Sequence, residues 1–191
     1  MANNMDTTLT IAKLDEQSFN KLKEIFNDGT NEYYTDTKHA IKQMYGDVDT
    51  NSLDWWYEHI GSKWLTIESS VDDEFEESVQ LYLTSAWDVP TPFLEKLRDI
   101  LVEINKDVVL YGTYQDESLD PRGAFVFGYE YDDMEDLDIE IDWDKYWSDD
   151  NADDDGEYRE WVYQQVLDHS DSLYESYLQV VEERKEDEES E

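Results

Sequence analysis

Hydrophobic and polar residues follow two different periods along this chain, and the change of period predicts a mixed fold of strands and helices. Alternation of apolar and polar residues is typical of half-buried strands, whereas apolar residues every three to four positions are typical of helices. The predicted strands cover residues 7–14, 64–69, 78–86, 108–114 and 124–131. The predicted helices follow Asp15, follow Thr37, cover 52–60, begin at Thr91 and cover 158–185.

Residues that commonly begin and end helices stand at the boundaries of these patterns. Asp15 is an N-cap residue, and Gly29, Gly46 and Gly61 are placed to end the first three helices. Thr91 is expected to cap the fourth helix, with Pro92 as its first helical residue. Its predicted buried stripe comprises Phe93, Leu94, Leu97, Ile100, Leu101 and Ile104.

The order of these elements predicts an α+β fold. We expect a ferredoxin-like βαββαβ antiparallel sheet with helices on one face, a helical insertion, an added hairpin strand and a long C-terminal helix. The predicted divisions are a ferredoxin-like domain (7–131), an acidic strand or linker (132–157), a C-terminal helix (158–185) and a disordered acidic tail (186–191).

Residues 135–144 (EDLDIEIDWD) carry the most informative pattern in the chain. In a strand, its four apolar side chains would face one way and five carboxylates the other. Carboxylates two residues apart on a strand are about 6.7 Å from one another, close to two phosphate steps of about 3.4 Å along one DNA strand. The five carboxylates belong to Asp136, Asp138, Glu140, Asp142 and Asp144.

We interpret this row as a substitute for phosphates. We expect seven nearby acids to support it: Asp132, Asp133, Asp149, Asp150, Asp153, Asp154 and Asp155. The alternative is an ordinary solvent-facing edge strand, whose charges prevent aggregation. One or two charges would serve that purpose, and five exceed it.

The net charge supports a special role for the acids. Asp and Glu number 51 against 14 Lys and Arg, which gives −37, whereas a magnitude of about 2–8 keeps a small domain soluble. Polyanion mimicry, adaptation to high salt, cation binding and an acidic surface without a special role are the alternatives. High-salt adaptation is disfavoured because Lys outnumbers Arg and because residues 107–191 carry 30 acidic side chains against 21 in residues 1–106.

The rest of the composition narrows the class of protein. The 14% aromatic content argues against disorder, and the absence of cysteine excludes disulfides and thiolate metal sites. No signal-peptide pattern and no long apolar run is present, so we expect a cytoplasmic location, in the host cell if the protein is phage-encoded. Catalytic sequence motifs are missing, and the scattered His39, His59 and His169 form no metal-binding motif. We therefore expect no enzymatic activity, no cofactor and no metal.

Two stretches resemble a known family. Residues 55–65 (WWYEHIGSKWL) resemble the W-x-x-x-x-W-G-T-K-W-D signature of the YubB-like ferredoxin-fold proteins of phages and conjugative plasmids, and residues 84–94 (TSAWDVPTPFL) resemble that family's A-W strand end followed by P-x-P and a helix. Ile60, Ser62 and Leu65 depart from the first signature. The resemblance spans roughly residues 7–130 and implies a ferredoxin-like fold and an origin in mobile elements, without an established chemistry.

An incomplete calcium-loop pattern lies in residues 149–160. Asn151, Asp153, Asp155 and Gly156 match the first half of an EF-hand loop, but the closing glutamate position holds Val162. Counting from Asp149 instead places Glu160 correctly and puts Asp154 where glycine is required. Cation binding by this loop is left open, with an acidic linker as the favoured interpretation.

Aromatic residues offer two further surfaces. Trp55, Trp56, Tyr57, Trp64 and Trp87 could stack on bases, but the net charge repels nucleic acid, and core packing is the favoured interpretation. In the last helix, Tyr174, Tyr177, Leu178 and Val181 fit either packing within the chain or a homodimer.

Together these patterns predict a nucleic-acid-mimicking inhibitor that occludes the binding site of a host defence protein, of the anti-CRISPR or antirestriction type. Its partner would be a basic DNA- or RNA-binding protein or complex, with no direct nucleic-acid or membrane binding. The alternative is a phage or plasmid protein–protein adaptor that uses an aromatic surface, with the acids serving only solubility.

Overall fold

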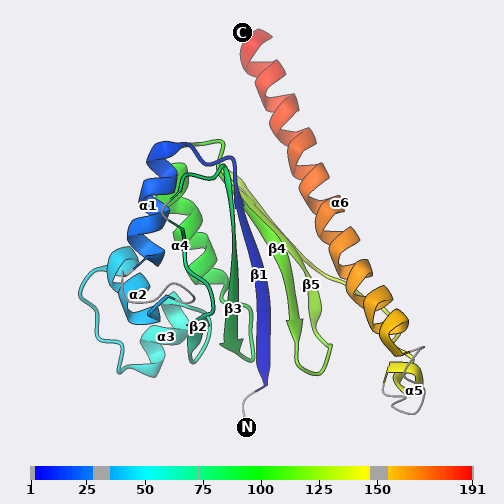
Figure 1. Ribbon diagram of the computed structural model, residues 1–191. Coiled ribbons are helices and arrows are strands. Elements are labelled where there is room, and N and C mark those ends of the chain that lie inside the picture. The colour runs from blue at the N-terminus through cyan, green and yellow to red at the C-terminus, as the bar shows by residue number, and fades with distance from the viewer. Residues whose placement is uncertain (1–2, 28–34, 73, 147–154, 191) are drawn as a thin grey trace.

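A six-stranded antiparallel sheet organises the chain, with helices packed on both of its faces (Figure 1). The computed structural model describes residues 3–27, 35–72, 74–146 and 155–190. The strand order is β2-β3-β1-β4-β5-β6, and each neighbouring pair is antiparallel. The strands are β1 (Asn4–Ala12), β2 (Leu65–Ile67), β3 (Ser78–Ala86), β4 (Val109–Asp116), β5 (Arg122–Gly128) and β6 (Tyr131–Asp136).

In the described part of residues 3–102, the helices begin and end within a few residues of their predicted positions. They are α1 (Glu16–Phe26), α2 (Thr37–Tyr45), α3 (Leu53–His59) and α4 (Thr91–Val102). Asp15 caps α1 by accepting a hydrogen bond from the Ser18 backbone amide, 2.8 Å away. Gly46 ends α2 with a positive φ of 77°, a conformation that favours glycine. Gly29 lies outside the described residues, and α1 ends before it.

The α4 helix differs from its prediction at both ends. Pro90 is its N-cap, so Thr91 is already helical. At the other end Ile104 lies beyond the last helical residue, Val102, and is 38% exposed. The predicted capping by Thr91 and the burial of Ile104 are therefore wrong.

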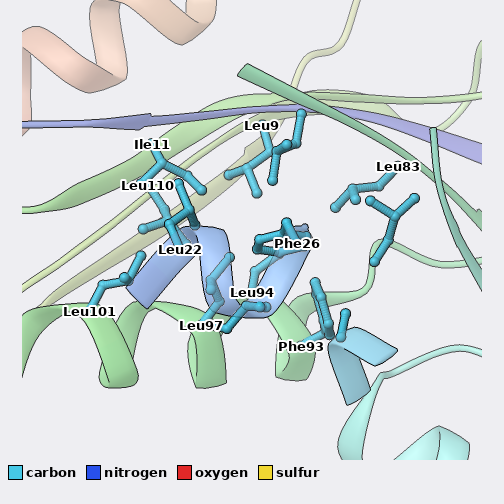
Figure 2. Close-up of a cluster of buried hydrophobic side chains, with 14 of the residues drawn as sticks. Leu9, Ile11, Leu22, Phe26, Leu83, Phe93, Leu94, Leu97, Leu101 and Leu110 are labelled. Atoms are coloured by element: carbon cyan, nitrogen blue, oxygen red, sulfur yellow. The ribbon is translucent and has the colours of Figure 1, made fainter. Parts of the chain in front are cut away.

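The main core lies between one face of the sheet and helices α1, α2 and α4 (Figure 2). The apolar positions of each alternating strand point toward this layer, which explains why the strands and the amphipathic helices form together. Its members include Leu9, Ile11, Leu22, Phe26, Leu83, Phe93, Leu94, Leu97, Leu101 and Leu110.

Helix α6 (Asp155–Ser190) covers part of the opposite sheet face (Figure 1). Leu173 and Tyr177 are buried there against Val109, Ala124 and Val126 of β4 and β5. The expected arrangement placed the helices of the ferredoxin-like domain on one face and did not assign a face to the C-terminal helix, which packs on the opposite one. The helix also continues to Ser190, so residues 186–190 are helical where we expected disorder.

The α6 residues that we considered as possible homodimer contacts pack against other parts of the same chain. Tyr174 stacks on Tyr111 of β4 with ring centroids 4.3 Å apart, and Leu178 and Val181 pack against the same small core. Packing within the chain is thus confirmed for these residues.

Candidate functional site: the acidic edge of the sheet

Strand β6 lies at one edge of the sheet, and its carboxylates divide between the two faces. On the α4 side, Arg98 forms an ion pair with Asp132, and the Tyr114 hydroxyl donates to Asp136 at 2.6 Å. On the α6 side, the Tyr131 hydroxyl donates to Asp133 at 3.4 Å. Asp132 and Asp133 therefore belong to different faces and do not form a common row.

The predicted strand over 135–144 is wrong beyond Asp136. Strand β6 ends there because β5, its neighbour in the described part of the sheet, begins at Arg122, which follows Pro121. One further hydrogen bond, from the Leu137 amide to the Arg122 carbonyl (2.8 Å), extends the pairing by one residue. Residues 137–142 then continue without regular secondary structure to the short helix α5 (Trp143–Tyr146).

The alternation of exposure nevertheless persists through residues 137–142, which we name the acidic segment. Leu137, Ile139 and Ile141 are half-buried, whereas the three acids between and after them are exposed. Those acids are Asp138, Glu140 and Asp142. Alternate side chains along an extended backbone point to opposite sides, so these three carboxylates remain on the solvent side although no ladder holds them.

Three tethers hold the acidic segment against the rest of the chain. Arg122 donates from its guanidinium to the Ile139 carbonyl, the Asp142 amide donates to the Tyr158 hydroxyl at 2.9 Å, and Leu137 is bound as described. Asp142 also begins α5, because its carboxylate accepts from the Lys145 amide at 3.2 Å. The segment is thus fixed from both β5 and α6.

Arg122 is the buried residue beneath this arrangement. It is only 5% exposed, and its guanidinium donates to the Leu119 and Ile139 carbonyls. Together with Asp120, Asp136 and Asp138 it lines a hollow of about 260 Å³. Its charge therefore lies among carboxylates, which offsets part of the cost of burying a cation.

Burial also affects the phenol beside the edge strand. Desolvation raises the pKa of Tyr114 above its ordinary value, and the hydrogen bond to Asp136 raises it further. The phenol therefore stays protonated at neutral pH and keeps donating to Asp136, so this carboxylate has fewer free lone pairs than its neighbours.

Aromatic side chains flank the exposed acids at the α5 end. Trp143 packs edge-to-face with Tyr146, and Tyr158 stacks with Trp161 at 5.5 Å between ring centroids. Trp143 and Trp161 are each 45% exposed. Asp144 of α5 is also exposed, next to Trp143. Acidic and aromatic groups are thus combined in one surface region.

Several predicted site residues lie where little can be described. Asp149, Asp150, Asp153 and Asp154 are outside the described residues, and so is most of the incomplete calcium loop. Asp155 is the first residue of α6. Within the ranges that the structure does describe, no cluster of three or more metal-binding side chains is found.

The five aromatics considered for base stacking do not form one platform. Trp55 and Trp56 pack against the main core, and the Trp56 indole donates to the Thr50 carbonyl at 2.8 Å. Tyr57 and Trp87 are exposed. Core packing is therefore confirmed for Trp55 and Trp56.

Sequence reasoning did not identify Arg122, Tyr158 and Arg98 as residues that position the acids. Arg122 left one signal, since it is the only charged residue in the otherwise apolar strand β5. The roles of Tyr158 and Arg98 depend on contacts between distant parts of the chain, for which the sequence gives no local signal.

Comparisons with protein-family models, curated proteins and solved structures found no match to this chain. Among the described helices, none combines the length and the apolar character needed to cross a bilayer.

Proposed function

We propose that the chain is a nucleic-acid-mimicking inhibitor that occupies the DNA- or RNA-binding cleft of a host defence protein, of the anti-CRISPR or antirestriction type. The observation that carries this proposal is the tethered acidic segment. Asp138, Glu140 and Asp142 are exposed there on a backbone that Arg122 and Tyr158 hold in place. With Asp136 before it and Asp144 after it, the segment offers an ordered run of negative charge to the host cytoplasm.

Such a run can replace phosphates for a physical reason. Basic clefts bind DNA largely by neutralising phosphates and releasing counterions, and carboxylates accept the same bidentate bonds from arginine. Fixed carboxylates lose less entropy on binding than mobile ones, and a folded surface adds shape recognition to charge. Neither a catalytic group nor a cofactor is needed for inhibition of this kind.

The fold supports the family resemblance within this proposal. The order β2-β3-β1-β4, with α1 and α4 between strands, is the order expected of a ferredoxin-like βαββαβ domain. We infer that β5, β6, α5 and α6 are additions to such a domain. An origin in phages or plasmids, which the resemblance implies, fits a protein directed against host defence.

The exposed tryptophans favour a second candidate, a protein–protein adaptor that binds through aromatic contacts. Trp143 and Trp161 are large anchors of the type that dominates binding energy at protein interfaces. In this alternative the acids contribute solubility alone.

Charge reversal tests the proposal. Asp138, Glu140 and Asp144 are replaced with lysine, while Asp142 is kept because it begins α5. The control reverses Glu74, Glu76 and Glu77, which are exposed in the loop between β2 and β3 at the other edge of the sheet. Both variants change the net charge equally.

The measurement is DNA binding by a purified CRISPR effector and by a purified restriction complex in a mobility-shift assay, with each variant as competitor. We expect the wild-type protein and the control to displace DNA. We expect the variant at 138, 140 and 144 to bind the target at least about 100-fold more weakly, because several charged contacts of about 1.4 kcal/mol or more are removed. Loss of inhibition on Trp143→Ala and Trp161→Ala, with no effect of charge reversal, would instead establish the aromatic adaptor. Absence of displacement by the wild-type protein in both assays would contradict mimicry of these targets.

A further inference from the structure

Basic residues gather around the turn between β5 and β6, at the opposite end of β6 from the acidic segment. Arg98 of α4 donates to the Gly128 carbonyl at 3.3 Å, and Arg184 of α6 donates to the Tyr129 and Glu130 carbonyls at 2.9 Å each. These bonds satisfy the carbonyls of the turn and fix both arginines. Two arginines thus contact this turn in a chain whose net charge is −37, although Arg98 is also paired with Asp99 and Asp132.

A pocket of about 260 Å³ lies beside this turn and collects further cations. Lys106, Arg184 and Lys185 line it, against two carboxylates, Asp107 and Glu130. Lys185 lies 3.4 Å from Asp107, and the Lys106 ammonium is 4.3 Å from the centroid of the Tyr129 ring. The pocket therefore has a local excess of positive charge.

A tyrosine side chain also lines this pocket. It belongs to Tyr177, and the residue as a whole is 2% exposed. Lys13 adds another cation, 5.8 Å from the centroid of the Tyr177 ring. A phenol hydroxyl can donate one hydrogen bond, so Tyr177 would add a neutral donor to the cationic groups of the pocket.

We propose that this pocket binds the phosphate group of a small anion. Every cationic group and the Tyr177 hydroxyl are donors, and a phosphate offers only acceptor oxygens to match them. The pocket is near the lower end of small-molecule site volumes, which favours inorganic phosphate or a small phosphate monoester over a larger ligand.

The net negative charge does not prevent such binding. Charges more than about 8 Å away are largely screened at physiological ionic strength. The nearby lysines and arginine therefore dominate the electrostatic interaction with a small anion in the pocket. A polyanion such as DNA would extend past the pocket and meet the acids elsewhere on the surface. This site is independent of the proposed mimicry, because different residues form it.

The test is a titration of the full-length protein with inorganic phosphate and, separately, with adenosine monophosphate. Ionic strength is held constant with potassium chloride, and ¹H–¹⁵N NMR spectra are followed. We expect saturable shifts at the amides of Tyr129, Glu130 and Tyr177. Saturation by inorganic phosphate assigns the site to the phosphate group, and at least tenfold tighter binding of the monophosphate assigns it to a phosphate monoester. Linear shifts, or shifts spread over the whole surface, for both probes would overturn the proposal.

Two variants locate the site within the pocket. Tyr177→Phe removes only the hydroxyl, and Lys106→Gln removes one charge. We expect each to weaken phosphate binding by about tenfold, the effect of losing one strong polar contact. The matched control is Lys42→Gln on α2, a lysine paired with Asp47 and remote from the pocket. Wild-type affinity in both pocket variants, with unchanged folding by circular dichroism, would refute the assignment.

Discussion

At the scale of single residues, Arg122 links the core to the acidic surface. Its guanidinium is buried and donates to carbonyls of two segments, Leu119 before β5 and Ile139 in the acidic segment. This side chain thus supplies one of the three contacts that hold the acidic segment where the sheet ends. The position of Asp138 and Glu140 depends on this contact.

Replacement of Arg122 by methionine should therefore free the acidic segment. The two carbonyls would lose their donor, and we expect a loss of about 2 kcal/mol in the free energy of unfolding, measured with urea. Hydrogen–deuterium exchange should accelerate at Leu137, whose amide is bound next to Arg122, and stay unchanged in β1 and β3. Unchanged exchange at Leu137 would show that other contacts hold the segment. The exposed Lys42→Met serves as control.

Tyr177 should give the protein a specific sensitivity to alkali. Burial, together with Tyr174 and Asp107, raises the pKa of Tyr177 to about 12 from 10.0, although Arg184 opposes this shift. Folding favours the protonated form, so its contribution to stability is complete below pH 10 and is lost as the pH rises toward 12. The free energy of unfolding should fall over this window, and fall less steeply in Tyr177→Phe. Equal slopes for the two proteins would contradict this.

At the scale of elements, the hydrophobic periodicity was sufficient to predict a strand or helix wherever a neighbouring element was available to pack against it. The β3 strand has its predicted bounds, Ser78–Ala86, and α2 ends before Gly46 as expected, although it begins at Thr37 rather than after it because Asp36 is its N-cap. In these elements local preference and tertiary packing agree. The same reasoning failed for 137–142, because alternation reports which side chains are buried and cannot report whether a neighbouring strand is present.

The sequence was sufficient to predict which acidic residues belong to the candidate site, but not how the fold holds them in place. The acids from Asp136 to Asp144 are evident from their spacing, and the three acids of the acidic segment are exposed. Their attachment requires Arg122 and Tyr158, which are distant from one another in the sequence and meet only after β5 and α6 have packed. The division of Asp132 and Asp133 between faces likewise follows from the observed end of the β5–β6 turn.

Gly128 determines how closely α6 approaches the sheet. A Cβ at this position would lie 2.5 Å from Cε2 and 2.8 Å from the hydroxyl oxygen of Tyr177. We expect Gly128→Ala to destabilise the fold by about 1–3 kcal/mol, because ring and helix must shift. A double-mutant cycle in urea with Tyr177→Ala should show that removing the ring relieves most of this clash. Additive effects of the two substitutions would exclude the contact as the cause.

At the scale of the whole molecule, charge is distributed unevenly. Exposed acids dominate the end that carries α5, whereas Lys106, Arg184 and Lys185 lie near the β5–β6 turn. Repulsion among the acids opposes folding, and each part of the chain experiences it to a different extent. One surface region is therefore strongly acidic, and another carries a small local excess of positive charge.

Screening of this repulsion should make added potassium chloride stabilising. Between 0.02 and 0.5 M, values chosen so that the Debye length falls from about 20 Å to about 4 Å, we expect a gain of about 2 kcal/mol, or about 4–8 °C in Tm for a chain of this size. Thermal unfolding followed by circular dichroism measures the effect. Chloride is chosen because sulfate stabilises proteins through exclusion from their surface. A Tm independent of chloride would mean that the repulsion is negligible.

The length of α6 has a consequence for the geometry of any complex. Its 36 residues rise about 1.5 Å each and span about 54 Å, a distance that corresponds to roughly 16 base pairs of duplex DNA at about 3.4 Å per pair. Asp142 lies near one end of α6, because its amide donates to the Tyr158 hydroxyl, and Glu182, Glu183 and Glu186 lie near the other end. A binding channel shorter than about 54 Å would contact the acids at one end of α6 only. The acids at the other end would then remain free to contact a neighbouring subunit.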